Sequence, residues 1–507
     1  MAVMVCVITS PAIVGLDTAT VQVEVDLRPG LPAFAVVGLP DAAVQEARER
    51  VRSGIANQGY RVPPVRIVAN LAPADLRKAG PQYDLPIALA ILAGAEQLSP
   101  SAVAGVGAAG ELALDGTLRP VAGTLAMAEH AARHGWRALV VPVQNAAEAA
   151  LVEGETTIIP VGSLREAAEV LAGERPVPIV APAPWPPDVR NDVPDLCDVH
   201  GQPAARRALE IAAAGMHSLL MVGPPGGGKT MLARRIPGLL PPLTRDDAIT
   251  LTRIHSVAGR LPPGQGLMSR RPFRAPHHSI SAAGLVGGGR LPQPGEVTLA
   301  HLGVLFLDEV GAFQPQVLDA LRQPMEHGVV DVVRAMASAR FPARPLLVCA
   351  GNPCPCGHAD DPGGRCVCPP GRAETYQARL SGPVADRIDI RIEVPRVDSA
   401  ALIEGVPDEP SSAVAARVEA ADARRIERGQ QYPNARLQGT ALRKAVSLDG
   451  NGRRVMESAM TRLGLTARGF DRVLRVARTI ADLDSSRKVG ESHLLEAVGL
   501  RAYRSLG

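Results

Sequence analysis

Apolar residues in the first third of the chain recur either at every second position or at every third to fourth position. Short alternating runs predict half-buried strands, and the longer period predicts helices with one buried face. The predicted strands are 21–27, 33–37 and 65–70, and the predicted helices are 41–57, 85–95 and 125–134. Strands and helices that alternate in this way predict an α/β or α+β domain, which we place at residues 1–172.

Proline dominates the next stretch, residues 173–196, which includes the run Ala-Pro-Ala-Pro-Trp-Pro-Pro at 181–187. Because proline has no amide hydrogen, this stretch cannot continue a helix or an interior strand. We therefore predict that residues 173–196 link two domains.

The pattern changes again beyond this linker. Over residues 197–397 it predicts, in order, helix 204–214, strand 218–222, a glycine loop, helix 230–236, and strands 304–307 and 346–350. That order is typical of an α/β nucleotide-binding domain with a parallel sheet. Residues 398–507 have helical spacing only, which predicts a C-terminal helical lid. Its predicted helices are 413–428, 440–446, 452–463, 467–483 and 491–503.

Composition supports a large globular protein with several domains. The length of 507 residues favours about three domains rather than one. Hydrophobic residues make up 46% of the chain and aromatic residues only 3%, so aliphatic packing must dominate its cores. The formal net charge of +3 neither requires nor excludes a nucleic-acid partner. Evidence for such a partner must therefore come from local basic patches.

Targeting features are not evident in the sequence. No run of eighteen apolar residues occurs, and residues 1–8 lack the basic start of a secretory signal. We therefore expect a cytoplasmic protein that does not span a membrane. The seven cysteines do not form the pattern of a secreted disulfide framework, because four of them crowd one short segment.

One glycine-rich loop matches the phosphate-binding pattern G-x-x-x-x-G-K-[ST]. It consists of Gly223, Pro224, Pro225, Gly226, Gly227, Gly228, Lys229 and Thr230. Glycines let backbone amides face phosphate oxygens, the lysine reaches the terminal phosphates, and the threonine hydroxyl binds Mg²⁺. An apolar strand precedes the loop and a helix follows it. That context favours nucleotide binding over a structural glycine turn, and it predicts ATP and Mg²⁺ as cofactors.

An acidic pair follows a second apolar run, Val304-Leu305-Phe306-Leu307. Phosphoryl transfer needs a partner for the metal ion and a residue that orients the attacking water. Asp308 at the end of this strand suits the role of a Mg²⁺ ligand. Glu309 suits the role of the residue that orients the attacking water. A surface acidic pair is the more common alternative, but the phosphate loop upstream favours the catalytic interpretation.

Five further motifs give the chain a specific resemblance over nearly its whole length. They are the residues at 37–41 (VGLPD), 68–75 (VANLAPAD), 274–279 (RAPHHS), 294–301 (PGEVTLAH) and 352–357 (NPCPCG). In this set and order they resemble the magnesium-chelatase-like AAA+ ATPases of the bacterial ComM/YifB type. The resemblance implies a Lon-protease-like N-terminal domain, an AAA+ core and a helical lid.

The resemblance also implies roles for three residues outside the two ATP motifs. Asn352 corresponds to the sensor that hydrogen-bonds the γ-phosphate or its water. Arg387 corresponds to an arginine finger that reaches the neighbouring subunit, and Arg468 to the sensor arginine of the lid. For both arginines an exposed ion pair is the alternative. A finger that acts in trans implies a homo-oligomeric ring, a hexamer in this family.

Proteolysis is not expected from the N-terminal domain. Where the Lon-type pattern places its serine, this chain has Gln82, and an amide is not a nucleophile. The segment 121–126 (VAGTLA) also lacks the partner lysine. The domain is therefore a scaffold, an assembly surface or a nucleic-acid contact.

Four cysteines form two C-x-C pairs in one segment: Cys354, Cys356, Cys366 and Cys368. Four thiolates are a sufficient ligand set for tetrahedral Zn²⁺, although C-x-C spacing is tighter than the usual C-x-x-C. Zinc and four reduced thiols therefore both stay open.

A basic, glycine-containing stretch separates the two ATP motifs, and such a loop suits a DNA backbone. Its candidate DNA contacts are Arg271, Arg274, His277, His278 and Arg290. A purely structural role is the alternative for each of them. The resemblance implies a hexameric DNA translocase that promotes branch migration during recombination and natural transformation. The alternative is the motor subunit of a metal-chelatase complex, although the chain has no D-x-S-x-S metal-adhesion motif.

Overall fold

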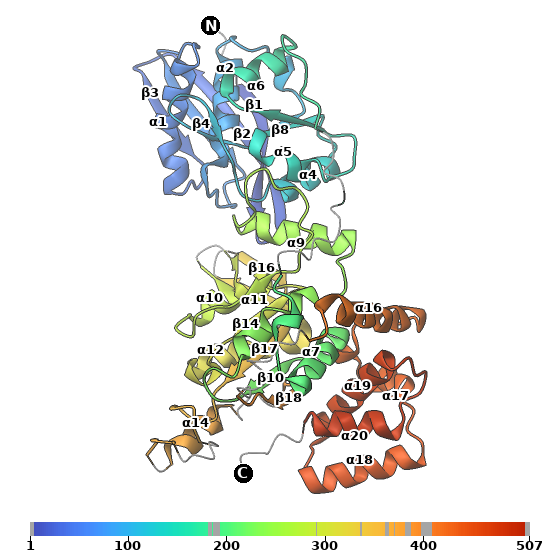
Figure 1. Cartoon of the computed structure of the whole chain (residues 1–507). Coiled ribbons are helices and arrows are strands. Elements are labelled where there is room, and N and C mark those ends of the chain that lie inside the picture. Colours follow the sequence, from blue (N-terminus) through green and yellow to red (C-terminus); the bar gives the residue numbers. More distant parts are fainter. Residues whose placement is uncertain are drawn as a thin grey trace.

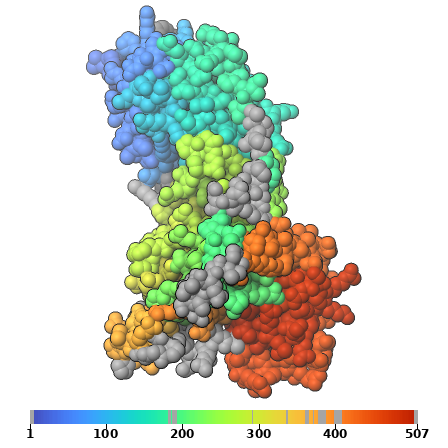
Figure 2. All heavy atoms as spheres, in the orientation of Figure 1, coloured from blue at the N-terminus to red at the C-terminus, as the bar shows by residue number. Residues whose placement is uncertain are grey.

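The computed structural model describes residues 5–180, 185, 193–289, 292–334, 337–359, 365–369, 371–380, 387–396 and 408–501. Its elements form three parts along the chain, an N-terminal α/β part, a central α/β core and a C-terminal group of helices (Figure 1). The N-terminal and C-terminal parts lie at opposite ends of the molecule, with the core between them (Figure 2). The predicted α/β class, with its parallel sheet and helical C-terminal region, is confirmed.

The N-terminal part is built on a seven-stranded mixed sheet in the order β3-β4-β2-β1-β5-β8-β9. The seven strands are β1 (Val5–Val14), β2 (Asp17–Arg28), β3 (Ala33–Val37), β4 (Arg66–Ala72), β5 (Val106–Ala108), β8 (Ala138–Pro142) and β9 (Thr157–Val161). Strands β6 (Glu111–Leu112) and β7 (Leu118–Arg119) form a separate two-stranded sheet. The helices of this part are α1 (Ala42–Asn57), η1 (Pro81–Tyr83), α2 (Asp84–Gly94), α3 (Pro100–Val103), α4 (Thr124–Arg133), η2 (Val143–Asn145), α5 (Ala146–Ala149) and α6 (Leu164–Ala172).

Local chemistry explains where these elements begin. The Asp41 carboxylate accepts a hydrogen bond of 2.9 Å from the amide of Val44 and so caps the N-terminus of α1. Strand β1 was not predicted, yet it pairs with β2 along its whole length, from Val5 opposite Asp26 to Val14 opposite Asp17. Side chains from α1 and α2 fill one hydrophobic core with those of the sheet.

The central core contains a five-stranded parallel sheet in the order β11-β14-β17-β10-β18. The core's strands are β10 (Leu219–Val222), β11 (Phe273–Arg274), β12 (Gly287–Gly288), β13 (Gln293–Pro294), β14 (Val304–Leu307), β15 (Val329–Arg334), β16 (Ala337–Pro342), β17 (Leu346–Gly351) and β18 (Ile390–Glu393). Its helices are η3 (Leu196–Asp198), α7 (Pro203–Gly215), α8 (Lys229–Ala233), η4 (Ile236–Gly238), α9 (Arg245–Val257), α10 (Ala282–Val286), α11 (Glu296–Leu299), η5 (Val310–Ala312), α12 (Pro315–Ala320), α13 (Arg322–His327) and α14 (Arg372–Leu380).

The predicted strand at 304–307 is confirmed, but the helix after the phosphate loop is shorter than predicted. Helix α8 ends at Ala233 rather than Ile236. The residue before a proline is disfavoured in a helix, and Pro237 follows Ile236, so the chain tightens there into the short 3₁₀ helix η4.

The C-terminal region is helical, as predicted. Its elements are α16 (Ser411–Glu427), η7 (Asn434–Arg436), α17 (Gly439–Ala445), α18 (Gly450–Leu463), α19 (Ala467–Leu483) and α20 (Glu491–Gly499). Helices α16, α19 and α20 share one hydrophobic cluster with α7 and with one face of the parallel sheet. These helices therefore pack directly on the core.

Helix α9 joins the N-terminal part to the core (Figure 1). Leu125 and Leu151 of the N-terminal part share a hydrophobic cluster with Leu251 of α9. The Ser256 hydroxyl donates a hydrogen bond to the buried Glu148 carboxylate across the same junction. Arg253 also pairs with Glu129 of the N-terminal part. In the described residues, no helix combines the length and the apolar character needed to cross a bilayer.

Candidate active site

Three neighbouring parallel strands bring the predicted ATP residues together. Strand β10 ends at the phosphate loop, β14 ends directly before Asp308, and β17, which lies between them, leads to Asn352. The carboxyl ends of parallel strands meet at one edge of a sheet, where such folds bind nucleotides. Strand order therefore gathers three segments that lie far apart in the sequence.

The phosphate loop depends on glycine for close backbone approach. A Cβ on Gly223 would lie 2.0 Å from the carbonyl oxygen of Val394, so no larger residue fits there. Gly228 has φ = 87°, a left-handed conformation that precedes the first residue of α8. The N-terminus of α8 therefore faces the loop, with its amides available to phosphate oxygens.

Lys229 lies at the centre of this loop and is 8% exposed. Its ammonium group donates hydrogen bonds to the carbonyl oxygens of Gly223 (2.7 Å) and Pro224 (2.9 Å) and to Oδ1 of Asn352 (3.1 Å). Burial lowers the pKa of Lys229, and the negative charges of Asp308 and Glu309 oppose that shift. The predicted sensor residue and the predicted phosphate-binding lysine are thus in direct contact.

The predicted Mg²⁺ ligands also meet. The Thr230 hydroxyl donates a hydrogen bond of 2.8 Å to Oδ2 of Asp308. A hydroxyl and a carboxylate are hard oxygen ligands of the kind Mg²⁺ prefers, and Mg²⁺ usually combines one or two such groups with phosphate oxygens. This donor set fits Mg²⁺ bound together with a nucleoside triphosphate.

Glu309 projects into solvent beside this pair, with a side chain 61% exposed. It adopts the left-handed conformation with φ = 50°, which is uncommon for residues other than glycine and recurs at functional sites. Oε2 of Glu309 lies 3.9 Å from Nδ1 of His278. The ring of His278 in turn packs against that of His277, with 4.0 Å between centroids. The predicted basic stretch therefore reaches the predicted catalytic acid.

The two predicted sensor and finger arginines lie near a common carboxylate. Arg387 donates a hydrogen bond of 3.0 Å through Nε to Oε1 of Glu326. The pKa of Glu326 is lowered mainly by this hydrogen bond from Arg387. The positive charge of Arg468 contributes to the same lowering. Arg468 lies in the first turn of α19, where its side chain is exposed.

Two of the predicted DNA contacts have structural partners instead. Arg271 donates a hydrogen bond of 2.7 Å to the carbonyl oxygen of Pro241, and Arg274 forms a two-pronged ion pair with Glu296 at 2.6 and 2.7 Å. These bonds hold the basic stretch onto the core, so the structural alternative applies to both arginines. Arg290 lies outside the described residues, as do residues 181–184 and 186–192 of the proline-rich linker and the predicted boundary at 397/398.

Two hairpins follow this stretch in the chain. One is β12–β13 and the other is β15–β16. A Cβ on Gly288 of the first would lie 3.2 Å from a guanidinium nitrogen of Arg334 in the second, so the hairpins are adjacent. Arg334 and the neighbouring Val333 are exposed.

A buried carboxylate behind the sheet was also missed. Oδ2 of Asp389 accepts hydrogen bonds of 3.3 Å from both the amide and the hydroxyl of Ser218, and it lies 3.4 Å from Nδ1 of His217. Arg472 of α19 approaches the other oxygen at 3.4 Å. Burial raises the pKa of Asp389, but His217 and the charged arginines outweigh burial and lower it. The single hydrogen of the Ser218 hydroxyl is shared between Oδ2 of Asp389 and the carbonyl oxygen of Arg387, which lies 3.0 Å from Oγ.

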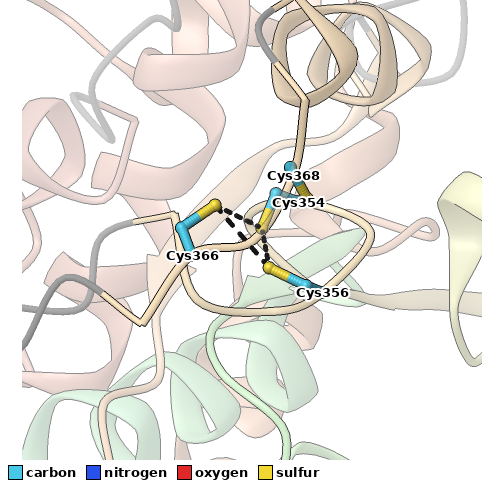
Figure 3. Close-up of side chains that lie close together, drawn as sticks. All are labelled: Cys354, Cys356, Cys366 and Cys368. Carbon is cyan, nitrogen blue, oxygen red and sulfur yellow. Dashed lines mark hydrogen bonds between the residues drawn. The ribbon is translucent and has the colours of Figure 1, made fainter.

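The four cysteines of the C-x-C pairs form one cluster. Their sulfur atoms all lie within 4.8 Å of one another. The sulfurs of Cys354, Cys356 and Cys366 point toward a common centre, with Cys368 beside Cys354 (Figure 3). The predicted grouping of the two pairs is therefore present.

The segment that would correspond to a protease dyad contains buried polar groups. Gln82 is 8% exposed, and Lys78 is fully buried with its ammonium group donating to the carbonyl oxygen of Pro73. Burial lowers the pKa of Lys78. Gln82 carries an amide, which is not a nucleophile.

Comparison with known proteins places this geometry in a family. The model described as "Magnesium chelatase, subunit ChlI" matches residues 195–402, "Subunit ChlI of Mg-chelatase" matches residues 23–145, and "Magnesium chelatase, subunit ChlI C-terminal" matches residues 408–501. These matches cover the phosphate loop, the acidic pair and the C-terminal helices. The family is one of AAA+ ATPases that use ATP and Mg²⁺.

Relatives match the chain from end to end. The protein YifB of Salmonella typhimurium is 43% identical over 99% of this chain and 97% of its own length. The competence protein ComM of Haemophilus influenzae is 42% identical over 98% of this chain and 97% of its own length. The chain therefore belongs to the ComM/YifB-type family of magnesium-chelatase-like AAA+ ATPases.

Proposed function

We propose that this ATPase is a ring-forming DNA translocase that uses ATP hydrolysis to drive branch migration during recombination and natural transformation. Support for the motor comes from one observation above all, the meeting of Lys229, Asn352, Thr230 and Asp308 at one sheet edge. Support for the DNA substrate comes from likeness to a competence protein over 98% of the chain.

Hydrolysis would use the residues around this edge. The backbone amides of the phosphate loop and the ammonium group of Lys229 would bind the phosphates, and Thr230 and Asp308 would hold Mg²⁺. When bound, Mg²⁺ neutralises negative charge on the phosphate oxygens. Glu309 would orient a water molecule and take its proton while the water oxygen bonds to the γ-phosphorus. The bond from that phosphorus to the bridging oxygen breaks, which leaves ADP and inorganic phosphate.

A ring follows if Arg387 completes the site of a neighbouring copy. An arginine that neutralises the charge of the transferring phosphoryl group accelerates such reactions by about 10³ to 10⁵. Within the chain, Arg387 is held by Glu326, so its transfer to a neighbour would exchange a carboxylate partner for a phosphate. This exchange would make ring assembly part of the catalytic cycle. A hexamer is the assembly that we propose.

DNA would contact the paired hairpins and the end of the basic stretch. Arg334 is exposed on one hairpin and lies next to Gly288 of the other. His278, at the end of the stretch, lies 3.9 Å from Glu309. A DNA backbone that displaced His277 and His278 would alter the surroundings of the catalytic acid Glu309. DNA binding would in this way be coupled to ATP turnover.

A metal-chelatase motor is the second candidate, because the matching family models carry that subunit's name. The two candidates differ in substrate. A labelled four-way junction incubated with the chain, Mg²⁺ and ATP should be converted to branch-migrated duplexes, and Glu309→Gln should abolish the conversion. ATP hydrolysis without any binding or conversion of the junction would reject the DNA function and favour the chelatase type.

A further inference from the structure

The cysteine cluster has the dimensions of a metal site. Sulfur–sulfur distances are 3.3 Å for Cys354–Cys356, 3.6 Å for Cys356–Cys366 and 3.9 Å for Cys354–Cys366. A disulfide requires about 2.05 Å between sulfurs. Four thiolates about 2.3 Å from a tetrahedral Zn²⁺ lie about 3.8 Å apart. The observed spacing fits the tetrahedron and excludes a disulfide among these three sulfurs.

One half of the cluster is joined to the phosphate loop. Cys354 follows Asn352 by two residues, and Asn352 accepts the hydrogen bond from Lys229. Gly357, directly after Cys356, packs on the phosphate loop so closely that a Cβ there would lie 2.4 Å from Cδ of Pro225. The first C-x-C pair is therefore flanked on both sides by contacts to the ATP site.

The other half is joined to the acidic pair. Cys366 and Cys368 precede α14, whose Tyr376 packs over the backbone of Gly311. A Cβ on Gly311 would lie 2.5 Å from Cζ of that ring, and Gly311 follows Glu309 by two residues. An ion that binds both pairs would link the sensor loop to the helix that packs beside Glu309.

We propose that these four cysteines bind one Zn²⁺ ion, and that this ion fixes the loop from Asn352 to Gly357 against the phosphate loop. Four protein ligands leave Zn²⁺ no open position, so the ion would be structural rather than catalytic. Its loss would release the Gly357–Pro225 contact and misplace Asn352. This consequence rests on the ATPase function proposed above, whereas the metal site itself does not.

Metal binding can be tested without any activity. The full chain, purified with its thiols reduced, should contain Zn²⁺ by elemental analysis and should accept Co²⁺ with the absorption spectrum of tetrahedral thiolate coordination. The double variant Cys356→Ser with Cys366→Ser should lose both properties. Cys197→Ser, which removes a thiol outside the cluster, should keep them. A wild-type chain that takes up neither Zn²⁺ nor Co²⁺ would overturn the site.

The link to ATP is tested by Gly357→Ala, which keeps all four thiols. The added methyl group must displace Pro225, so we expect affinity for a fluorescent, non-hydrolysable ATP analogue to fall about tenfold. Gly429→Ala is the matched control, because Gly429 has a similar left-handed φ of 71° and a Cβ on it meets nothing within 4 Å. Loss of bound Zn²⁺ along with affinity would also support the link.

Wild-type affinity in Gly357→Ala, or in the wild-type chain stripped of Zn²⁺ by a chelator, would overturn the link. These outcomes are separate from failure of the proposed function. A chain that binds Zn²⁺ and hydrolyses ATP but leaves four-way junctions unchanged would reject branch migration and keep the metal inference.

Discussion

The ammonium group of Lys229 and the side-chain oxygen of Asn352 are 3.1 Å apart, although 123 positions separate the residues in the chain. Strand β17 ends next to β10 in the parallel sheet, and this neighbourhood brings Asn352 to the phosphate loop. An amide in that position can report the presence of a γ-phosphate, because it shares the lysine that would bind it. The cysteine cluster begins two residues beyond Asn352, so the same loop joins the sensor to the proposed metal site.

Replacement of the two central ATP residues should separate binding from hydrolysis. Lys229→Ala removes the positive charge that meets the terminal phosphates and should abolish ATP binding and turnover. Glu309→Gln keeps the shape of the side chain but cannot accept a proton, so it should bind ATP while turnover falls by at least about a hundredfold. Nucleotide affinity and phosphate release measured on the same preparations distinguish the two. Normal turnover in the Glu309→Gln protein would refute its role.

Mixed rings should reveal whether the finger acts between subunits. Arg387→Ala and Lys229→Ala should each reduce turnover by about 10³ or more when pure. In a mixture, a Lys229→Ala subunit would lend its intact Arg387 to a neighbour with an intact phosphate loop. Partial ATP hydrolysis should therefore return on mixing. A mixture as inactive as its components, in rings shown to exchange subunits, would count against a finger in trans.

Asp389 should act as a positioning residue for Arg387. Asp389→Asn keeps the size of the side chain but removes the charge that faces His217 and Arg472. We expect unchanged ATP affinity and a loss of turnover of about tenfold or more, because the variant loses the charge that orders His217, Ser218 and Arg472 directly beside the Arg387 backbone.

The mixed-ring assay separates positioning from misfolding. Asp389→Asn subunits have an intact phosphate loop, so added Lys229→Ala subunits should restore their turnover. Asp84→Asn is the matched control, since it removes another buried carboxylate far from Arg387 and should leave turnover unchanged. Failure of Lys229→Ala to restore Asp389→Asn, in conditions where it restores Arg387→Ala, would dismiss the positioning role.

The hairpin and the basic stretch should contribute to DNA affinity. Arg334→Ala combined with His277→Ala removes one exposed cation and one exposed ring, while the ion pair of Arg274 with Glu296 stays intact. Affinity for a four-way junction should fall, and the salt dependence of binding should decrease by about one unit of slope for the lost arginine. The single variant Arg334→Ala, which leaves the histidines beside Glu309 in place, should leave DNA-free ATP turnover unchanged. Equal affinity in variant and wild type would remove these residues from the DNA path.

Stability of the N-terminal part should decrease in mild acid because of His130. Its ring nitrogens lie 2.9 and 2.7 Å from the hydroxyls of Thr18 and Thr20. Burial, with the nearby charges of His134 and Arg133, lowers the pKa of His130 to about 4. An unfolded histidine has a pKa of about 6.5, so the unfolded state takes up a proton first as pH falls. This difference should reduce the unfolding free energy by about 3 kcal/mol between pH 7 and pH 4.

Fluorescence can follow that transition locally. Trp136 packs edge-on against His130 with 5.4 Å between ring centroids, and Trp185 is the other of the two tryptophans. Urea unfolding of a Trp185→Phe chain, followed by Trp136 emission, should show the loss of stability below pH 6.5. The additional variant His130→Gln should flatten the pH profile. The same slope with and without His130 would contradict the assignment.

Some parts of the site could be predicted because their information is local. The phosphate loop and the Asp308–Glu309 pair are contiguous motifs, each following an apolar strand, so spacing alone places their side chains. Partnerships across the sequence could not be predicted in this way. The ion pair of Arg274 with Glu296, for example, gives a predicted DNA contact a structural partner. Nothing in the local pattern reveals a partner that arrives through tertiary packing.

Among the helices and strands, too, those fixed by local sequence were predicted and those that depend on tertiary pairing were missed. Helix α19 was predicted at its observed bounds, because its apolar positions repeat at helical spacing and Thr466 caps its first turn. Strand β1 was missed because Thr9, Ser10 and Pro11 interrupt its apolar alternation, and only pairing with β2 makes this segment a strand. The contact of Gly357 with Pro225 was also hidden, since it depends on how two loops pack.

Rates of ATP hydrolysis with and without a four-way DNA junction test the central claim most directly. The account predicts Mg²⁺-dependent hydrolysis by the purified chain, a higher rate with the junction, and no hydrolysis with the Glu309→Gln variant. A chain that fails to bind adenine nucleotide with Mg²⁺, or one whose rate of hydrolysis is the same with and without the junction, would contradict it.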